Sequence, residues 1–147
     1  MEVWYQTVTE DEFTMDMVPE AFADLVEAVG IRSFLAICRR FAGGAVTVPL
    51  DREVRVRPCS DHDLLPLIGE KAYRRYHQCL GSSTVYFPTL EKLFTPVRDL
   101  RMIQEYHQGM SYLQVAQRYG VSTMTVKTVM RRASRHHRHH ATTNKPL

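Results

Sequence analysis

The sequence predicts a mainly α-helical protein with short β-strands, in which a duplicated helix–helix–strand module precedes a C-terminal helix-turn-helix domain. Three observations support this prediction. Residues 24–49 align without gaps on residues 63–88. Residues 95–134 read as three short helices separated by glycine breaks. Basic side chains gather toward the C-terminal end, whereas the charged residues of segment 1–31 are all acidic.

The composition is that of a globular protein with a basic end. The 147 residues suffice for one ordinary domain or two small ones, and an apolar fraction of 44% can supply a core. The net charge is only +3, but residues 98–147 contain nine Lys or Arg against two acids. Residues 1–31 contain eight acids and no Lys or Arg. The basic end predicts a polyanionic partner.

Missing motifs argue against several classes of protein. The chain has no GxSxG, GxxxxGK[ST] or HExxH motif, so we predict no enzyme activity and no bound metal or cofactor. Three cysteines without a CxxC motif indicate a reducing compartment, and Cys38 and Cys79 are expected to be buried. The sequence shows no signal peptide and no apolar run of membrane-spanning length, so we expect a cytoplasmic protein without membrane contact.

Residues 1–18 read as an acidic N-terminal arm. Trp4, Tyr5 and Phe13 are scattered through it with little periodicity. Such a segment is able to dock on a partner, but a mobile, solvated arm is the favoured interpretation.

An internal repeat occupies most of residues 19–94. The two units, 24–49 and 63–88, are offset by 88 − 49 = 39 residues. Each reads as a short helix, a glycine break, an amphipathic helix, a turn of small residues and a strand stopped by proline, which is one module used twice. The identical pairs are Asp24/Asp63, Leu25/Leu64, Gly30/Gly69, Val46/Val85 and Pro49/Pro88.

One unit alone cannot bury its apolar helix faces, so the two units are expected to pack together. Their strands, Ala45–Val48 and Thr84–Phe87, are then predicted to pair. Between the units, residues 52–58 alternate as in a short edge strand protected by charge. Leu90, Leu93 and Phe94 are expected to form a short helical connector to the next domain.

Helix signals are clearest in residues 95–134. Thr95 and Pro96 suit the start of a helix whose apolar stripe is Val97, Leu100, Ile103 and Tyr106, and Gly109 ends it. A second helix opens with a capping box and a third with a serine cap. The residues that carry these signals are Ser111, Gln114 and Ser122.

The break between the second and third helices is the most informative feature. Ala116 is small where two helices would cross, and Gly120 can take the positive φ of a tight turn. Val126 and Val129 would then pack the third helix onto the second. This spacing is that of a helix-turn-helix, with an ordinary helical hairpin as the alternative.

The outward face of the predicted helix 123–133 carries no acid, which favours contact with DNA. The side chains expected at base edges or at the start of this helix are Thr123, Met124, Thr125, Lys127, Thr128 and Arg131. The side chains expected at phosphates are Arg118, Arg132, Arg135 and Arg138. Residues 135–147 read as a mobile basic tail along the phosphates. Its neighbouring histidines could bind a metal, but no ligand spacing elsewhere completes a site.

Two stretches resemble the Mor/C transcription activators of Mu-like phages and prophages. AICRRFAGGAVTVP at 36–49, echoed at 76–88, is similar to their helix–strand dimerisation module, and residues 97–132 are similar to their DNA-binding domain. The resemblance implies a homodimer that binds double-stranded DNA at an imperfect promoter dyad and recruits host RNA polymerase. It also implies that residues 19–94 serve dimerisation and that Val85–Pro88 steers the DNA-binding units.

The second copy of the module departs from this family pattern. Two copies allow pairing within one chain or exchange between two chains, and a homodimer is favoured. Two other functions stay open: a protein-interaction module that reuses the fold without binding DNA, and a repressor with the same fold.

Overall fold

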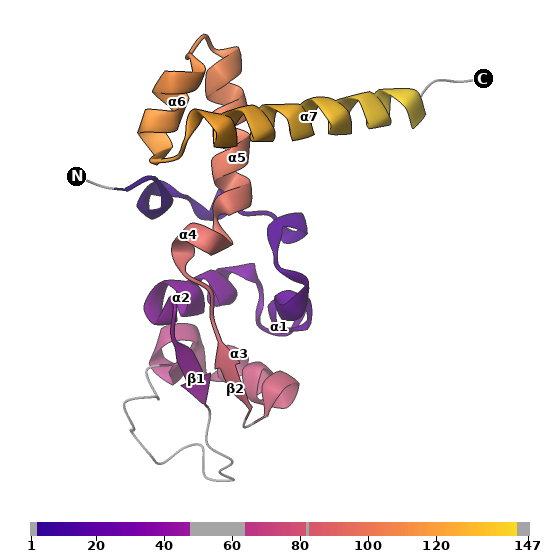
Figure 1. Ribbon diagram of the computed structural model, residues 1–147. Helices are drawn as coiled ribbons and strands as arrows, with labels where there is room; N and C mark the ends of the chain where they lie inside the picture. The colour runs from indigo at the N-terminus through magenta and orange to yellow at the C-terminus, as the bar shows by residue number, and fades with distance from the viewer. Residues whose placement is uncertain (1–2, 48–63, 82, 144–147) are drawn as a thin grey trace. The chain divides into compact units, whose positions relative to one another are not determined.

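The computed structural model describes residues 3–47, 64–81 and 83–143, with side chains described as far as residue 135. It is mainly helical with a small two-stranded sheet, as predicted. The chain divides into two compact units (Figure 1). One comprises Val8–Phe94; the other joins the first seven residues to everything from Thr95 onward. Within the described residues, no helix has the length and apolar character needed to cross a membrane.

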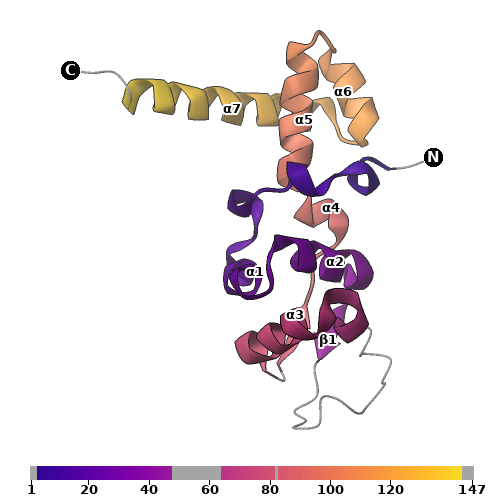
Figure 2. The same ribbon diagram turned by 180° about the vertical axis from the view of Figure 1, so that it is seen from behind.

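Three helices form the core of the Val8–Phe94 unit. Helix α1, Ala23–Val29, and α2, Ile31–Phe41, meet at Gly30, whose φ of 89° ends one helix and begins the next. Helix α3, Leu64–Leu80, contacts both of them and is kinked at Gly69; Figure 2 shows the three from behind. The side chains that these helices bury include Leu25, Val26, Phe34, Ile37, Leu64, Tyr73 and Tyr76.

The two glycine breaks have nearly the same backbone geometry. Gly30 has φ 89° and ψ 155°, and Gly69 has φ 86° and ψ 163°. These glycines are one of the identical pairs of the sequence alignment. Positive φ suits glycine because it has no Cβ, so the same residue makes the same bend in both halves.

The predicted strand pairing is confirmed, and it lies within the chain. Strand β1, Ala45–Thr47, runs antiparallel to β2, Thr84–Tyr86 (Figure 1). Val46 lies opposite Val85 at the centre of the ladder, so another identical pair of the alignment meets across the sheet. Residues 52–58, predicted as an edge strand, lie outside the described residues.

The expected connector is also confirmed. Helix α4, Leu90–Leu93, is capped by the Thr89 hydroxyl, which accepts a 3.3 Å hydrogen bond from the Lys92 amide. Leu93 and Phe94 are buried, and the Phe94 ring lies 5.6 Å from that of Phe13.

The expectation of a solvated N-terminal arm is wrong. Short 3₁₀ helices at Trp4–Thr7, Glu10–Glu12, Met15–Met17 and Glu20–Phe22 fold this segment. Val8 and Phe13 are only 4% and 2% exposed, and Arg39 donates a 3.2 Å hydrogen bond to the Val8 carbonyl. The irregular spacing of its apolar residues hid this packing, because successive short turns bury residues without one helical period.

Cys79, expected to be buried, is exposed, whereas Cys38 is buried.

The second unit is built on three helices: α5, Thr95–His107; α6, Tyr112–Tyr119; and α7, Thr123–Thr143. Their shared core is Met102, Val115, Ala116, Tyr119, Val126 and Val129. Leu100, predicted on the buried stripe of α5, is 47% exposed, and Met102 is buried in its place. Helix α7 passes the predicted end at 133, so the mobile tail expected from residue 135 is helical as far as Thr143.

The predicted ends of α6 and the predicted start of α7 are confirmed, whereas Thr95, expected to cap α5, is its first residue. The amide of Gln114 donates to the Ser111 hydroxyl at 3.2 Å, and the Ser111 amide donates to the Gln114 side chain at 2.9 Å. Gly120 ends α6 in the left-handed conformation, with φ 65°. The Thr125 amide donates to the Ser122 hydroxyl at 3.1 Å, which caps α7.

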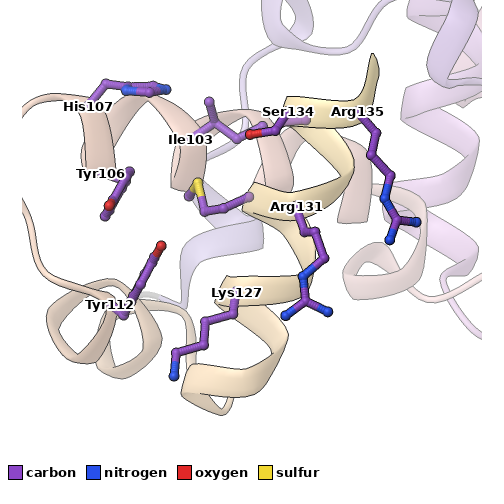
Figure 3. A pocket seen from close by; sticks show the side chains of 10 residues that line it. Ile103, Tyr106, His107, Tyr112, Lys127, Arg131, Ser134 and Arg135 are labelled. Atoms are coloured by element: carbon purple, nitrogen blue, oxygen red, sulfur yellow. The ribbon is translucent and has the colours of Figure 1, made fainter. Parts of the chain in front are cut away.

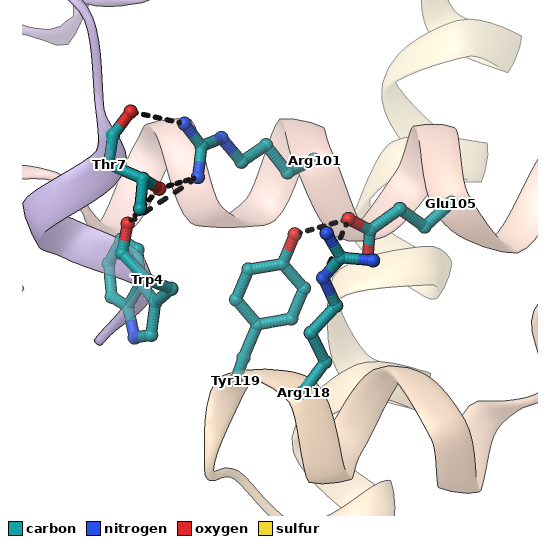
Figure 4. A network of polar contacts seen from close by, with 6 residues as sticks. All are labelled: Trp4, Thr7, Arg101, Glu105, Arg118 and Tyr119. Atoms are coloured by element: carbon teal, nitrogen blue, oxygen red, sulfur yellow. Dashed lines mark hydrogen bonds and ion pairs between the residues drawn. The ribbon is translucent and has the colours of Figure 1, made fainter. Parts of the chain in front are cut away.

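The first residues of the chain complete this unit. Trp4 packs against the three-helix core, edge-on to Tyr119. Arg101 of α5 donates to the Thr7 hydroxyl at 2.8 Å and to the Thr7 carbonyl at 3.2 Å (Figure 4).

Candidate nucleic-acid interface

Helix α7 divides sharply into a buried and an exposed side. Val126 and Val129 are buried at helical spacing. On the other side Met124 is 65% exposed, and four cations are also exposed: Lys127, Arg131, Arg132 and Arg135. Helix α7 contains no Asp or Glu, and none of these cations has an ion-pair partner within the described part of the chain. The charged side chains described on its exposed side are therefore all cationic.

Thr123, Thr125 and Thr128 of α7 are half-buried, and two of them have local partners. The Thr125 hydroxyl lies 3.1 Å from the Ser122 hydroxyl, in the helix cap. The Thr128 hydroxyl donates to the Met124 carbonyl at 2.9 Å. In this structure both hydroxyl groups therefore serve the helix, and the longer side chains beside them reach farther out.

A groove of about 1150 Å³ runs beside α7 (Figure 3). One side is formed by Lys127, Arg131 and Arg135, which recur every four residues along the helix. The opposite side includes Tyr106 and His107 from the end of α5 and Tyr112 from the start of α6. None of the described residues that line the groove is Asp or Glu. The structure thus brings three predicted DNA-binding cations into one groove, and no described acidic side chain there neutralises their charge.

The aromatic side of the groove is ordered by a close ring pair. The rings of Tyr106 and Tyr112 stack with centroids 4.8 Å apart and an interplanar angle of 3°. The Lys127 ammonium lies 6.0 Å from the centre of the Tyr112 ring. A hydrogen bond with Tyr112 raises the pKa of Tyr106.

A family comparison identifies the chain. The model of the Mor transcription activator family matches residues 55–144, which include α3, β2, α4 and all three helices of the second unit. The chain belongs to the Mor transcription activator family. The resemblance noted from the sequence is therefore confirmed. Comparisons with curated proteins and with solved structures found no significant match.

The family match begins after β1 of this Mor-family chain. Helices α1 and α2 and strand β1, which form the first copy of the sequence repeat, precede the matched residues. The second copy, residues 63–88, and the cationic helix α7 lie within them. Membership in the family assigns the chain to transcription activators, a class of regulators rather than enzymes.

Arg118, predicted at a phosphate, has a partner inside the protein. Its Nε lies 3.4 Å from Glu105 Oε1, and the Tyr119 hydroxyl donates to the same oxygen at 2.7 Å (Figure 4). Burial, followed by this hydrogen bond, raises the pKa of Tyr119. The Arg118 side chain is still 60% exposed, but it does not line the groove.

The remaining predicted residues separate into two groups. Met124 and Arg132 are exposed on α7 outside the groove lining, and the Arg138 side chain lies outside the described residues. The described side chains contain no cluster of three His, Cys, Asp or Glu suited to a metal. The sequence did not predict Tyr112 and His107 as residues of the interface, and it placed Tyr106 on a buried stripe. The signal that could have indicated them is their position at the two ends of the α5–α6 loop.

Proposed function

We propose that this Mor-family chain is a sequence-specific DNA-binding transcription activator that acts in the cytoplasm and reads DNA with α7. The observation that carries the proposal is the acid-free exposed side of α7, held by a tight turn onto α6. A surface of this kind suits phosphates and the electronegative edges of the major groove.

Helices α6 and α7 have the features of a helix-turn-helix. Ala116 is buried where the helices meet, and Gly120 turns the chain with φ 65°. The Val121 amide donates to the Ala116 carbonyl at 3.0 Å, which closes the turn. In such a unit the second helix enters the major groove.

The exposed residues have different expected roles. Lys127 and Arg131, with Met124 beside them, would reach base edges, and each good bidentate base contact discriminates by about 1–3 kcal/mol. Thr123, Thr125 and Thr128 would line the approach. Arg132, Arg135 and Arg138 would meet phosphates, joined by Arg118 if its ion pair opens.

The repeat forms a single paired module in this proposal. The matching glycine bends and the Val46–Val85 pairing support a duplicated helix–helix–strand unit that closes within one chain. Two such chains would then bind a promoter dyad as a homodimer, one DNA-binding unit to each half-site, and contact RNA polymerase. A lone unit of this type reads few base pairs, which favours a dimer.

The test is selection of binding sites from a pool of random duplexes, followed by light scattering of the protein and its complex. The expected result is a conserved two-fold sequence bound by a species of twice the 17.0 kDa chain mass. An asymmetric single half-site would contradict the dimer, and no enrichment would contradict DNA binding. In vitro transcription from a promoter with the selected site distinguishes an activator from a repressor.

A further inference from the structure

The proposed contacts of α7 leave one side of its groove without a role. Tyr112 and His107 line an open groove together with Lys127, Arg131 and Arg135 of α7 (Figure 3). Both come from the ends of the α5–α6 loop, which the base contacts do not use. The side chains here are phenol, imidazole, ammonium and guanidinium, all of which can donate a hydrogen bond to an anion.

We propose that this groove receives one sugar-phosphate strand of the DNA, with the Tyr112 hydroxyl donating to a phosphate next to the base edge that Lys127 reads. The inference rests on the proposed function, because it takes α7 to be the helix in the major groove. It adds a neutral aromatic contact, supplied by α6, to the cationic contacts of α7.

Charge and shape favour a DNA strand over other occupants. Three cations recur along the groove at four-residue spacing and none of its described lining residues carries a carboxylate, which suits a polyanion rather than one small anion. The cations are exposed, so the groove is open along the side from which α7 would meet a duplex. Tyrosine and lysine are both common donors to backbone phosphates.

Tyr106 acts through Tyr112 as a positioning residue. The coplanar rings fix the plane of Tyr112, and a hydrogen bond between the two side chains raises the pKa of Tyr106.

The main test is Tyr112→Phe, with Tyr5→Phe as the matched control in the same unit but outside the groove. Binding is measured to the selected site and to random duplex DNA over a salt series. Because Tyr112→Phe loses a hydrogen bond to a charged group, its affinity for both duplexes is expected to fall about tenfold. The salt dependence of binding should keep its slope, because no charge is removed. Arg135→Ala, which removes a cation from the same groove, is expected to reduce the slope by about 0.9. Tyr5→Phe should bind as wild type does.

A second measurement identifies the phosphate. Duplexes that carry one neutral methylphosphonate are compared for wild type and Tyr112→Phe. At one position in each half-site, the neutral linkage should strongly weaken DNA binding by the wild type and weaken binding by Tyr112→Phe much less. The reason is that the linkage and the substitution remove the same contact. Tyr106→Phe should weaken binding less than Tyr112→Phe and add nothing to it in the double variant.

The failures are distinguishable. Wild-type affinity in a folded Tyr112→Phe protein, or additive penalties at every phosphate, would overturn this inference while Lys127→Ala still tests the proposed function. Failure of the wild type to bind any duplex would overturn both.

Discussion

The indole ring of Trp4 lies edge-on to the phenol ring of Tyr119, with centroids 6.0 Å apart and planes at 67°. The two residues are far apart in the sequence, yet they share the core that also holds α7. Arg101 secures this arrangement through its hydrogen bonds to Thr7. The unit that we propose as DNA-binding is therefore assembled from both ends of the chain.

Removal of the indole should destabilise that unit. We expect Trp4→Ala to lower its free energy of unfolding by about 1–3 kcal/mol, less than for a fully buried tryptophan because the side chain is half-buried. Chemical denaturation followed by the amide signals of α5–α7 measures this. Tyr86→Ala is the control, since Tyr86 is 76% exposed. Equal stability of Trp4→Ala and wild type would show that the ring contact contributes nothing.

Base and phosphate contacts should respond differently to substitution. Lys127→Ala and Arg131→Ala are expected to weaken binding to the selected site more than binding to random DNA, because both side chains are exposed in the N-terminal part of α7, which would enter the DNA major groove. Arg135→Ala and Arg138→Ala should weaken both about equally and flatten the salt dependence. Titrations with the two duplexes at several salt concentrations test this. If all four variants lose equally on both duplexes, the assignment of base contacts is wrong.

The turn before α7 should depend on glycine. Gly120 has φ 65°, and a Cβ added there meets nothing within 4 Å. A substitution therefore costs backbone strain rather than a clash. Gly120→Val should lower the free energy of unfolding by about 1–3 kcal/mol and impair DNA binding, whereas Gly120→Asn should cost less because asparagine tolerates this conformation. Thermal melting of the two variants compares them directly; equal melting would contradict the role of the turn.

Alkaline pH should destabilise the Val8–Phe94 unit through Cys38. Burial raises the pKa of this thiol from 9.0 to about 12. A raised folded-state pKa contributes stability below pH 9 that is lost as the pH rises from 9 toward 12. Denaturant titrations between pH 8 and 11 should show a shallower decline for Cys38→Ala than for wild type. Peptide mapping after alkylation should find the exposed Cys79 modified first; faster modification of Cys38 would contradict its burial.

Local features of this protein were determined by the sequence alone. The helix caps and the tight turn depend on backbone groups within a few residues, so the sequence predicts them. They are the Ser111–Gln114 capping box, the Gly120 turn and the Ser122 cap. The pairing of Val46 with Val85 was also predictable, because the repeat marks the two strands as equivalent.

Only the tertiary structure decided how distant segments pack. Trp4 reaches Tyr119, Tyr112 stacks on Tyr106, and Met102 rather than Leu100 is buried. The acidic first residues show no helical or strand periodicity that would predict the burial of Val8 or Phe13. Burial of this kind depends on which surfaces pack together. When such a surface is formed by segments far apart in the sequence, no single segment has the regular spacing of apolar residues that would predict it.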